Sequence, residues 1–224
     1  MADLPELSAY SLEPGFRVIP SRYPPVGLFD RVADPADLDQ VFAIEALTND
    51  RLREEVGQLQ LVPRTRRIAG PGTSPIMAAF THPRESRFSD GQFGVLYAAS
   101  ELEAAIEETK HHSARFLMAT KEAPINVEMR SYVVQIATKR ACDIRVGYDA
   151  EHDPDSYVAS REFGLRARNA NVDALVYRSV RKSGAHCVAA FFPDIVSRHV
   201  QHKHFQYAWN GRSIEHVLEM TLQK

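Results

Sequence analysis

Residues 85–97, with the sequence ESRFSDGQFGVLY, organise the chain, because a turn-rich segment there runs into a strand and then into a helix. The strand is predicted over residues 93–98, where Gly94 permits a close approach of another backbone segment. The stretch supplies the fixed cation of Arg87 and the amphipathic ring of Tyr97. A guanidinium can hold a phosphate or carboxylate through two hydrogen bonds, and a tyrosine can stack and donate a hydrogen bond.

The helix that follows is predicted over residues 101–116. Ser100 and Glu103 have the spacing of a capping box at its start. Small alanines flank Glu108 on the same side of the helix, so a carboxylate suited to acid–base work or to stabilising a cation has room beside it. A surface arginine and a helical glutamate in an i, i+4 ladder would explain the same residues, and the pattern alone leaves both interpretations open.

The remaining segments predict a mixed fold. The chain through Gly15 is expected to be a loose lead-in, and prolines limit the next strand to about residues 16–19. Strands and helices do not alternate regularly, which favours an α+β fold with largely antiparallel strands and flanking helices. Helices are predicted within 34–61 and over 156–168, and strands over 127–138, 172–180 and 187–192, with a C-terminal hairpin within 199–224.

Composition sets the class of protein. The 224 residues are expected to form a single domain, 1–224, with an ordinary share of 44% hydrophobic and 25% charged residues. A net charge of −2 gives no reason to expect direct binding to nucleic acid or to a membrane. Two cysteines, Cys142 and Cys187, suit a reducing compartment, and the N-terminus lacks the pattern of a signal peptide. We therefore expect a soluble cytoplasmic protein.

Other chemistries fit the sequence less well. The histidines at 111 and 112 and the cluster near residues 199–204 match no zinc spacing, so no metal is expected. Ser179 lacks the nucleophile elbow of a hydrolase, and Cys187 lies in an apolar strand where it behaves as a small hydrophobe. The basic run at 64–67 is either a solvated loop or a contact with an acidic partner.

Five blocks of the sequence stand out when taken in order: FRV at 16–18, SRFS at 86–89, LYAA at 96–99, AIEETKHH at 105–112 and VYRSVR at 176–181. Together they resemble the RES domain family, which is named for an arginine, a glutamate and a serine. Two departures are that ESRFS at 85–89 replaces the usual GGRWN type of block, and that a helical insertion occupies about residues 34–61. The resemblance implies an ADP-ribosyltransferase-like fold.

Carried over position by position, the resemblance implies five site residues. Glu108, Arg87, Tyr97 and Ser179 would be catalytic, and Arg17, Arg87, Tyr97 and Ser179 would bind substrate. Glu107 is the rival of Glu108, and Arg22 is the less favoured candidate for the first arginine.

Most RES proteins are toxins of bacterial toxin–antitoxin pairs, so the resemblance implies an enzyme that cleaves the nicotinamide–ribose bond of NAD+ by hydrolysis or phosphorolysis. NAD+ would then be the substrate, and no cofactor is expected. The implied partner is an Xre-type helix-turn-helix antitoxin, with a homo-oligomer within the complex left open. Transfer of ADP-ribose to a macromolecule, or an inactive RES-fold binding module, are the alternatives.

Overall fold

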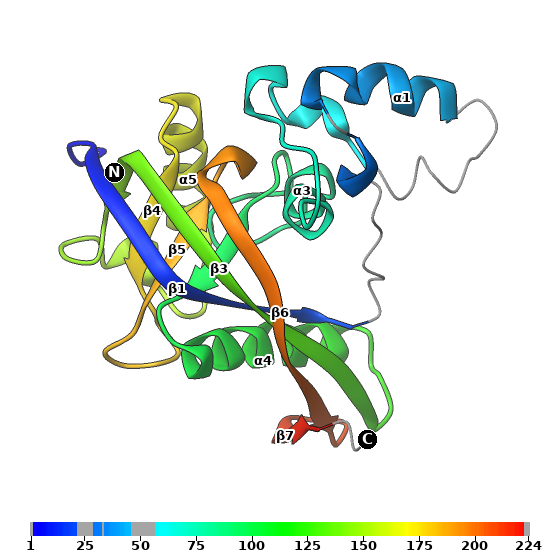
Figure 1. The fold of residues 1–224 in the computed structure, drawn as a ribbon. Helices are drawn as coiled ribbons and strands as arrows, with labels where there is room; N and C mark the ends of the chain where they lie inside the picture. The colour runs from blue at the N-terminus through cyan, green and yellow to red at the C-terminus, as the bar shows by residue number, and fades with distance from the viewer. Residues whose placement is uncertain (1, 22–28, 33, 46–56, 222–224) are drawn as a thin grey trace.

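The computed structural model describes residues 2–21, 29–32, 34–45 and 57–221 of the chain. Seven strands form one sheet in the order β1-β2-β5-β4-β3-β6-β7 (Figure 1). The strands are β1 (Ser8–Pro20), β2 (Leu96–Ala99), β3 (Ile125–Asp143), β4 (Ala174–Arg178), β5 (His186–Ala190), β6 (Val196–Trp209) and β7 (Ile214–Met220). Of the described pairs, β3–β4 is parallel and the others are antiparallel, which confirms the predicted α+β class.

Helices flank this sheet. They are α1 (Leu38–Glu45), α3 (Ser74–Thr81), α4 (Leu102–Ala119) and α5 (Val158–Asn169). Short 3-10 helices lie at Phe29–Arg31, Pro35–Asp37, Leu59–Leu61, Arg64–Arg66, Ala150–His152 and Pro193–Ile195. Within the described residues, no helix combines the length and the apolar composition needed to cross a membrane.

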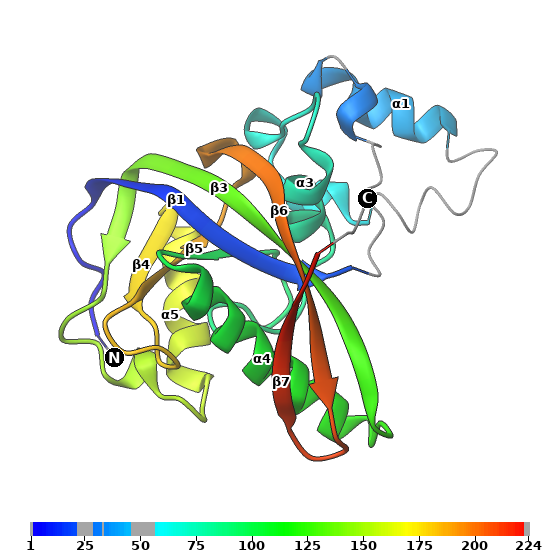
Figure 2. The same ribbon diagram turned by 60° about the horizontal axis from the view of Figure 1, so that its bottom comes forward.

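The first strand closes part of the sheet on itself. β1 pairs with β3 along most of its length and also meets β2, where Phe16 lies opposite Ala99. Strands β1, β2, β5, β4 and β3 therefore form a ring, and β6 and β7 extend it as a hairpin beside β3 (Figure 2). Residues from both halves of the chain are thereby brought to one place.

Two hydrophobic cores stabilise this arrangement, one on each side of the strands. The first packs α4 and α5 against the sheet, with Phe88 and Phe163 fully buried in it. The second packs α1 and α3 against the other side, through residues such as Leu38, Phe42 and Met77. Figure 1 accordingly shows α3 and α4 on opposite sides of the crossing of β1, β3 and β6.

Two glycines allow the loop that carries Arg87 to lie close to its neighbours. A Cβ added at Gly94 would lie 2.2 Å from the carbonyl oxygen of Ala79 on α3, as the predicted close approach requires. A Cβ at Gly164 on α5 would lie 2.1 Å from the carbonyl oxygen of Phe88. A larger side chain at Gly94 would push this segment away from α3, and one at Gly164 would push the Arg87 loop away from α5.

Several local predictions were wrong. The lead-in expected through Gly15 is part of β1, because a register shift between Leu12 and Gly15 accommodates Pro14 within the ladder. Ser100 does not cap α4: the N-cap is Glu101, and Ser100 Oγ accepts a hydrogen bond from the backbone N–H of His186 instead. Of the helices expected within 34–61, the part over residues 46–56 lies outside the described residues.

Candidate active site

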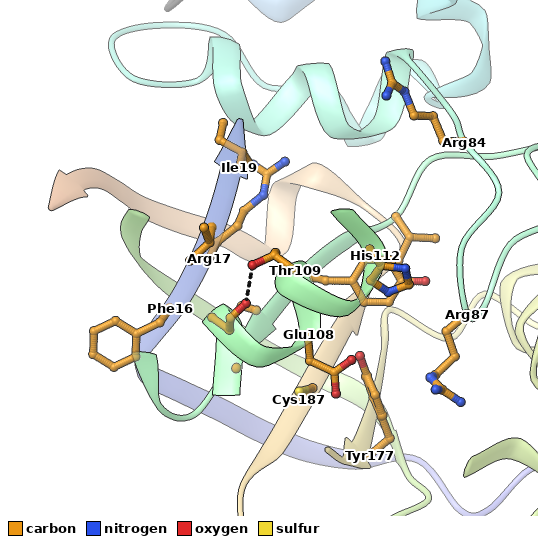
Figure 3. A pocket seen from close by; sticks show the side chains of 16 residues that line it. Phe16, Arg17, Ile19, Arg84, Arg87, Glu108, Thr109, His112, Tyr177 and Cys187 are labelled. Atoms are coloured by element: carbon orange, nitrogen blue, oxygen red, sulfur yellow. Dashed lines mark hydrogen bonds between the residues drawn. The ribbon is translucent and has the colours of Figure 1, made fainter. Parts of the chain in front are cut away.

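A cavity of about 340 Å³ opens between β1, the end of the Arg87 loop, β2 and α4. Four of the five predicted site residues line it: Arg17, Arg87, Tyr97 and Glu108. Its size falls at the lower end of the range for small-molecule sites. In Figure 3, Glu108 lies between Arg17 on one side and Arg87 on the other. Segments separated by some ninety residues of sequence thus converge on one hollow.

Glu108 is the carboxylate that faces the cavity. It projects from α4 beside Ala105, which is buried and also lines the hollow. Its rival Glu107 does not line the cavity and instead pairs with Lys110, at 3.3 Å between Nζ and Oε1. The helix geometry therefore separates the two candidates, because neighbouring positions point in different directions.

Ser179 orients this carboxylate. Its Oγ donates a hydrogen bond to Glu108 Oε1 at 2.7 Å. Ser179 Oγ also accepts hydrogen bonds from the backbone N–H groups of Arg181 and Lys182, at 3.2 and 3.1 Å. Because the two N–H groups occupy the lone pairs, the hydroxyl proton points at Glu108. The arrangement suits a residue that positions Glu108 rather than a nucleophile.

Arg87 is held in a buried position, with 3% of its surface exposed. Its Nη1 donates to the carbonyl oxygens of Glu151 and Asp153, at 3.2 and 2.9 Å. Its guanidinium lies 4.5 Å from the centre of the Tyr157 ring. The Nη2 atom is buried without a hydrogen-bond partner in the described part of the chain, so this cation keeps donor capacity for an anion.

Tyr97 contributes its ring to the cavity and its hydroxyl to the loop. The hydroxyl donates to Ser86 Oγ at 2.8 Å and accepts from the backbone N–H of Phe88 at 3.0 Å. Burial raises the pKa of Tyr97 to about 12, so the phenol stays neutral at physiological pH. Because the hydroxyl is engaged on both sides of Arg87, Tyr97 fixes the loop and leaves its ring for contact with a ligand.

Arg17 reaches the cavity from β1. Its Nη1 donates to the carbonyl oxygen of Pro75 at 2.9 Å and lies 3.2 Å from His199 Nε2. Burial lowers the pKa of Arg17 to about 10, which still leaves it charged at neutral pH. The alternative arginine, Arg22, lies outside the described residues.

Sequence reasoning missed three residues around this site. Tyr177 lines the cavity beside Glu108 (Figure 3). Burial is the main reason why the pKa of Tyr177 lies well above its usual value, and the nearby Cys187 and Glu108 raise it further. His112 lines the cavity from α4, one helical turn after Glu108. His199 packs against Tyr132, with ring centres 4.0 Å apart and ring planes tilted by 36°, and its Nε2 contacts Arg17. Tyr177 could have been found from the sequence, because it lies two residues before Ser179 and successive odd positions of a strand share one face. The sequence holds no comparable signal for His199.

The sequence offered three other candidate features: a thiol, groups of metal-ligating side chains and a basic run. Cys187 is buried, and burial raises the pKa of its thiol to about 12, which fits a packed thiol rather than a nucleophile. Within the described ranges, no group of three histidine, cysteine, aspartate or glutamate side chains could hold a metal ion. The basic run 64–67 is used internally: Arg66 pairs with Asp173 and Asp194, and Arg67 pairs with Asp39.

Comparisons with known proteins place the chain in a family. The sequence model of the RES domain matches residues 64–210, which is more than half of the chain, so the protein belongs to the RES domain family. The match includes Arg87, Tyr97, Glu108 and Ser179, whereas Arg17 and the segment 34–61, which was expected to be an insertion, precede it.

Two individual proteins are similar to this chain. The uncharacterized protein y4oC of Sinorhizobium fredii is 29% identical over 202 residues, which cover 89% of this chain and 84% of y4oC. The solved structure of the M. tuberculosis MbcT–MbcA toxin–antitoxin complex matches with a TM-score of 0.44 and 10% identity, over 96% of this chain and 87% of that one.

Proposed function

We propose that this RES protein is an enzyme that cleaves the nicotinamide–ribose bond of NAD+. The observation that carries the proposal is the single cavity in which Arg17, Arg87, Tyr97 and Glu108 converge, with Ser179 hydrogen-bonded to the carboxylate. NAD+ would be bound as substrate. Its two phosphates offer acceptors to the arginines, and its positively charged nicotinamide ribosyl group suits a carboxylate.

The reaction follows from the chemistry of this bond. The C1′–N bond breaks, nicotinamide leaves with the bonding electrons as a neutral molecule, and positive charge develops on the ribose as an oxocarbenium ion. No general acid is needed for this leaving group. In hydrolysis a water oxygen then bonds to C1′ and a proton is released, while in phosphorolysis a phosphate oxygen forms that bond.

Glu108 would stabilise the developing cation. An ionised carboxylate beside C1′ opposes the positive charge of the transition state and can also bind a ribose hydroxyl. The hydrogen bond from Ser179 fixes one carboxylate oxygen, so the group is oriented before substrate binds. The Tyr97 ring would stack on the nicotinamide or ribose, and Arg17 and Arg87 would hold the phosphates.

Membership of the RES family supports a biological role as the toxin of a toxin–antitoxin pair. In that role the enzyme would deplete the NAD+ of its own cell unless an antitoxin of the Xre helix-turn-helix type covered it. Co-expression with the product of an adjacent gene encoding such a protein should remove the growth arrest that the enzyme causes alone. Growth arrest that persists with every such partner would contradict the proposed pairing.

The enzymatic proposal is tested by incubating the purified chain with NAD+ and measuring nicotinamide release by chromatography. Wild-type protein should release nicotinamide, and Glu108→Gln should lower the rate by at least ~100-fold. Glu107→Gln is the matched control, because Glu107 does not line the cavity, and it should retain activity. No release by the wild type would leave a binding module, and labelling of added proteins with ADP-ribose would indicate a transferase.

A further inference from the structure

The wall of the cavity beside Arg87 continues into a group of cations around Tyr157. Besides Arg87, the guanidinium carbons of Arg115 and Arg161 lie 5.6 and 5.9 Å from the centre of the Tyr157 ring. The ring centre of Tyr157 is 6.1 Å from that of His112, which lines the cavity itself. These contacts join the cations to the proposed active site.

Three buried donor atoms in this wall have no hydrogen-bond partner among the described residues: Arg87 Nη2, Tyr157 Oη and Arg181 Nε. Arg181 belongs to the same wall, because its Nη2 lies 2.9 Å from Nε2 of His111, whose ring contacts that of His112. Folded proteins rarely leave buried donors unpaired, and two of these three belong to permanent cations. Their common feature is the lack of an acceptor.

The charge of the wall is only partly balanced. Of its four arginines, Arg161 pairs with a carboxylate, Glu85, at 3.0 Å, whereas no carboxylate in the described part of the chain forms an ion pair with Arg87, Arg115 or Arg181. Two acidic side chains, Asp153 and Asp155, lie near these cations, and the Asp153 carboxylate accepts the backbone N–H groups of residues 155 and 156. Desolvation is the main cause that lowers the pKa of His111, and the charges of Arg181 and Arg115 lower it further. The His111 ring therefore stays a neutral partner of Arg181.

We propose that this wall is a phosphate subsite in which a phosphoryl group accepts hydrogen bonds from Arg87 Nη2 and Tyr157 Oη, with Arg115 and Arg181 adding positive charge. The inference rests on the proposed function and extends it to Tyr157 and Arg115, which lie outside the family blocks that suggested it. The phosphoryl group can belong to the diphosphate of the dinucleotide. It can also be free inorganic phosphate, whose oxygen would bond to C1′ as the C1′–N bond breaks and nicotinamide leaves with the electron pair.

Two substitutions test the subsite in the full chain. Tyr157→Phe removes one unpaired hydroxyl and keeps the ring under the arginines, and Arg115→Ala removes an exposed cation. Tyr148→Phe and Arg212→Ala are the matched controls, because both lie outside the wall. Binding of inorganic pyrophosphate and of inorganic phosphate is measured by titration calorimetry. Each test variant should weaken binding of at least one anion by ~10-fold, and the controls should match the wild type. Wild-type protein that binds neither anion, or test variants that bind like wild type, would overturn the subsite.

Kinetics then separate the two sources of the phosphoryl group. If the subsite holds the diphosphate, inorganic phosphate competes with NAD+, and both test variants raise KM for NAD+. If it holds free phosphate, added phosphate accelerates nicotinamide release, ADP-ribose 1-phosphate forms, and the test variants lose that acceleration. If the protein binds the anions through Tyr157 and Arg115 but never releases nicotinamide, the subsite stands and the proposed reaction is refuted. Failure of the subsite and failure of the proposed reaction are therefore distinguishable.

Discussion

The hydrogen bond between Ser179 and Glu108 gives the sharpest test of the proposed chemistry. At 2.7 Å it joins a hydroxyl to a carboxylate, and such bonds to charged groups contribute ~1.5–3 kcal/mol. If this energy is used to orient Glu108 in the transition state, Ser179→Ala should lower kcat by ~10- to ~100-fold. Removal of the charge itself, in Glu108→Gln, should cost ~3–4 kcal/mol, or ~10²–10³ in rate.

A double-mutant cycle shows whether the serine acts through the carboxylate. With Glu108→Gln already present, adding Ser179→Ala should change the rate by less than ~3-fold, because the bond to the charge no longer exists. Ser100→Ala is the matched control, because the Ser100 hydroxyl also accepts a hydrogen bond from a backbone N–H group, that of His186 on β5, but does not touch Glu108. Nicotinamide release and thermal unfolding are measured for every variant.

Two results would refute this reasoning. Near-normal turnover in Glu108→Gln would remove the carboxylate from the mechanism. An equal loss from Ser179→Ala in both backgrounds, without a change in unfolding temperature, would mean that the hydroxyl acts independently of Glu108.

Four further predictions follow from the geometry. Arg87→Lys should weaken NAD+ binding, because an ammonium cannot reproduce the guanidinium fork; unchanged affinity in titration would contradict the clamp role. Burial, and to a lesser extent the charge of Arg17, lower the pKa of His199 to about 3. Between about pH 6.5 and pH 3 the unfolded chain therefore binds a proton at this histidine that the folded chain does not bind. Stability should therefore fall as the pH drops from about 6.5 toward 3, and His199→Phe should show a smaller fall in urea unfolding at pH 7 and pH 4. Gly164→Ala should destabilise the fold by ~1–3 kcal/mol, because the added Cβ meets the carbonyl oxygen of Phe88; a stability equal to wild type would mean that the loop shifts freely. Cys187 should resist iodoacetamide at pH 8 in the folded protein and react after unfolding, since burial raises the pKa of its thiol to about 12; rapid alkylation of the native protein would contradict this.

Much of the fold was accessible from sequence because its signals are local. Alternating apolar residues located β3, and an apolar pair of strands joined by a polar turn located β4 and β5. The start of β1 was missed because Pro14 is a strong local breaker, and only pairing with β3, far along the chain, shows that a register shift absorbs it. The cap of α4 was assigned wrongly for a similar reason, since Ser100 bonds to the distant His186.

The same difference between local sequence signals and contacts of distant segments applies to the candidate site. Arg87, Tyr97 and Glu108 were identified through the family resemblance, and the cavity they share is visible only in three dimensions. That Tyr97 would use its hydroxyl to hold the Arg87 loop could not be predicted, because the partners are a side chain and a backbone group fixed by the fold. The same holds for His199, which reaches Arg17 from the far end of the sequence.

The ring closed by β1 has a consequence for how the cavity comes into being during synthesis. Arg17 is synthesised before its partners, because the strand that carries it pairs mainly with residues 129–141, and Ser179 follows later still. A nascent or truncated chain that ends before β4 therefore lacks part of the hollow. The proposed active site can therefore be complete only after the chain has been synthesised through Cys187, which also lines the cavity.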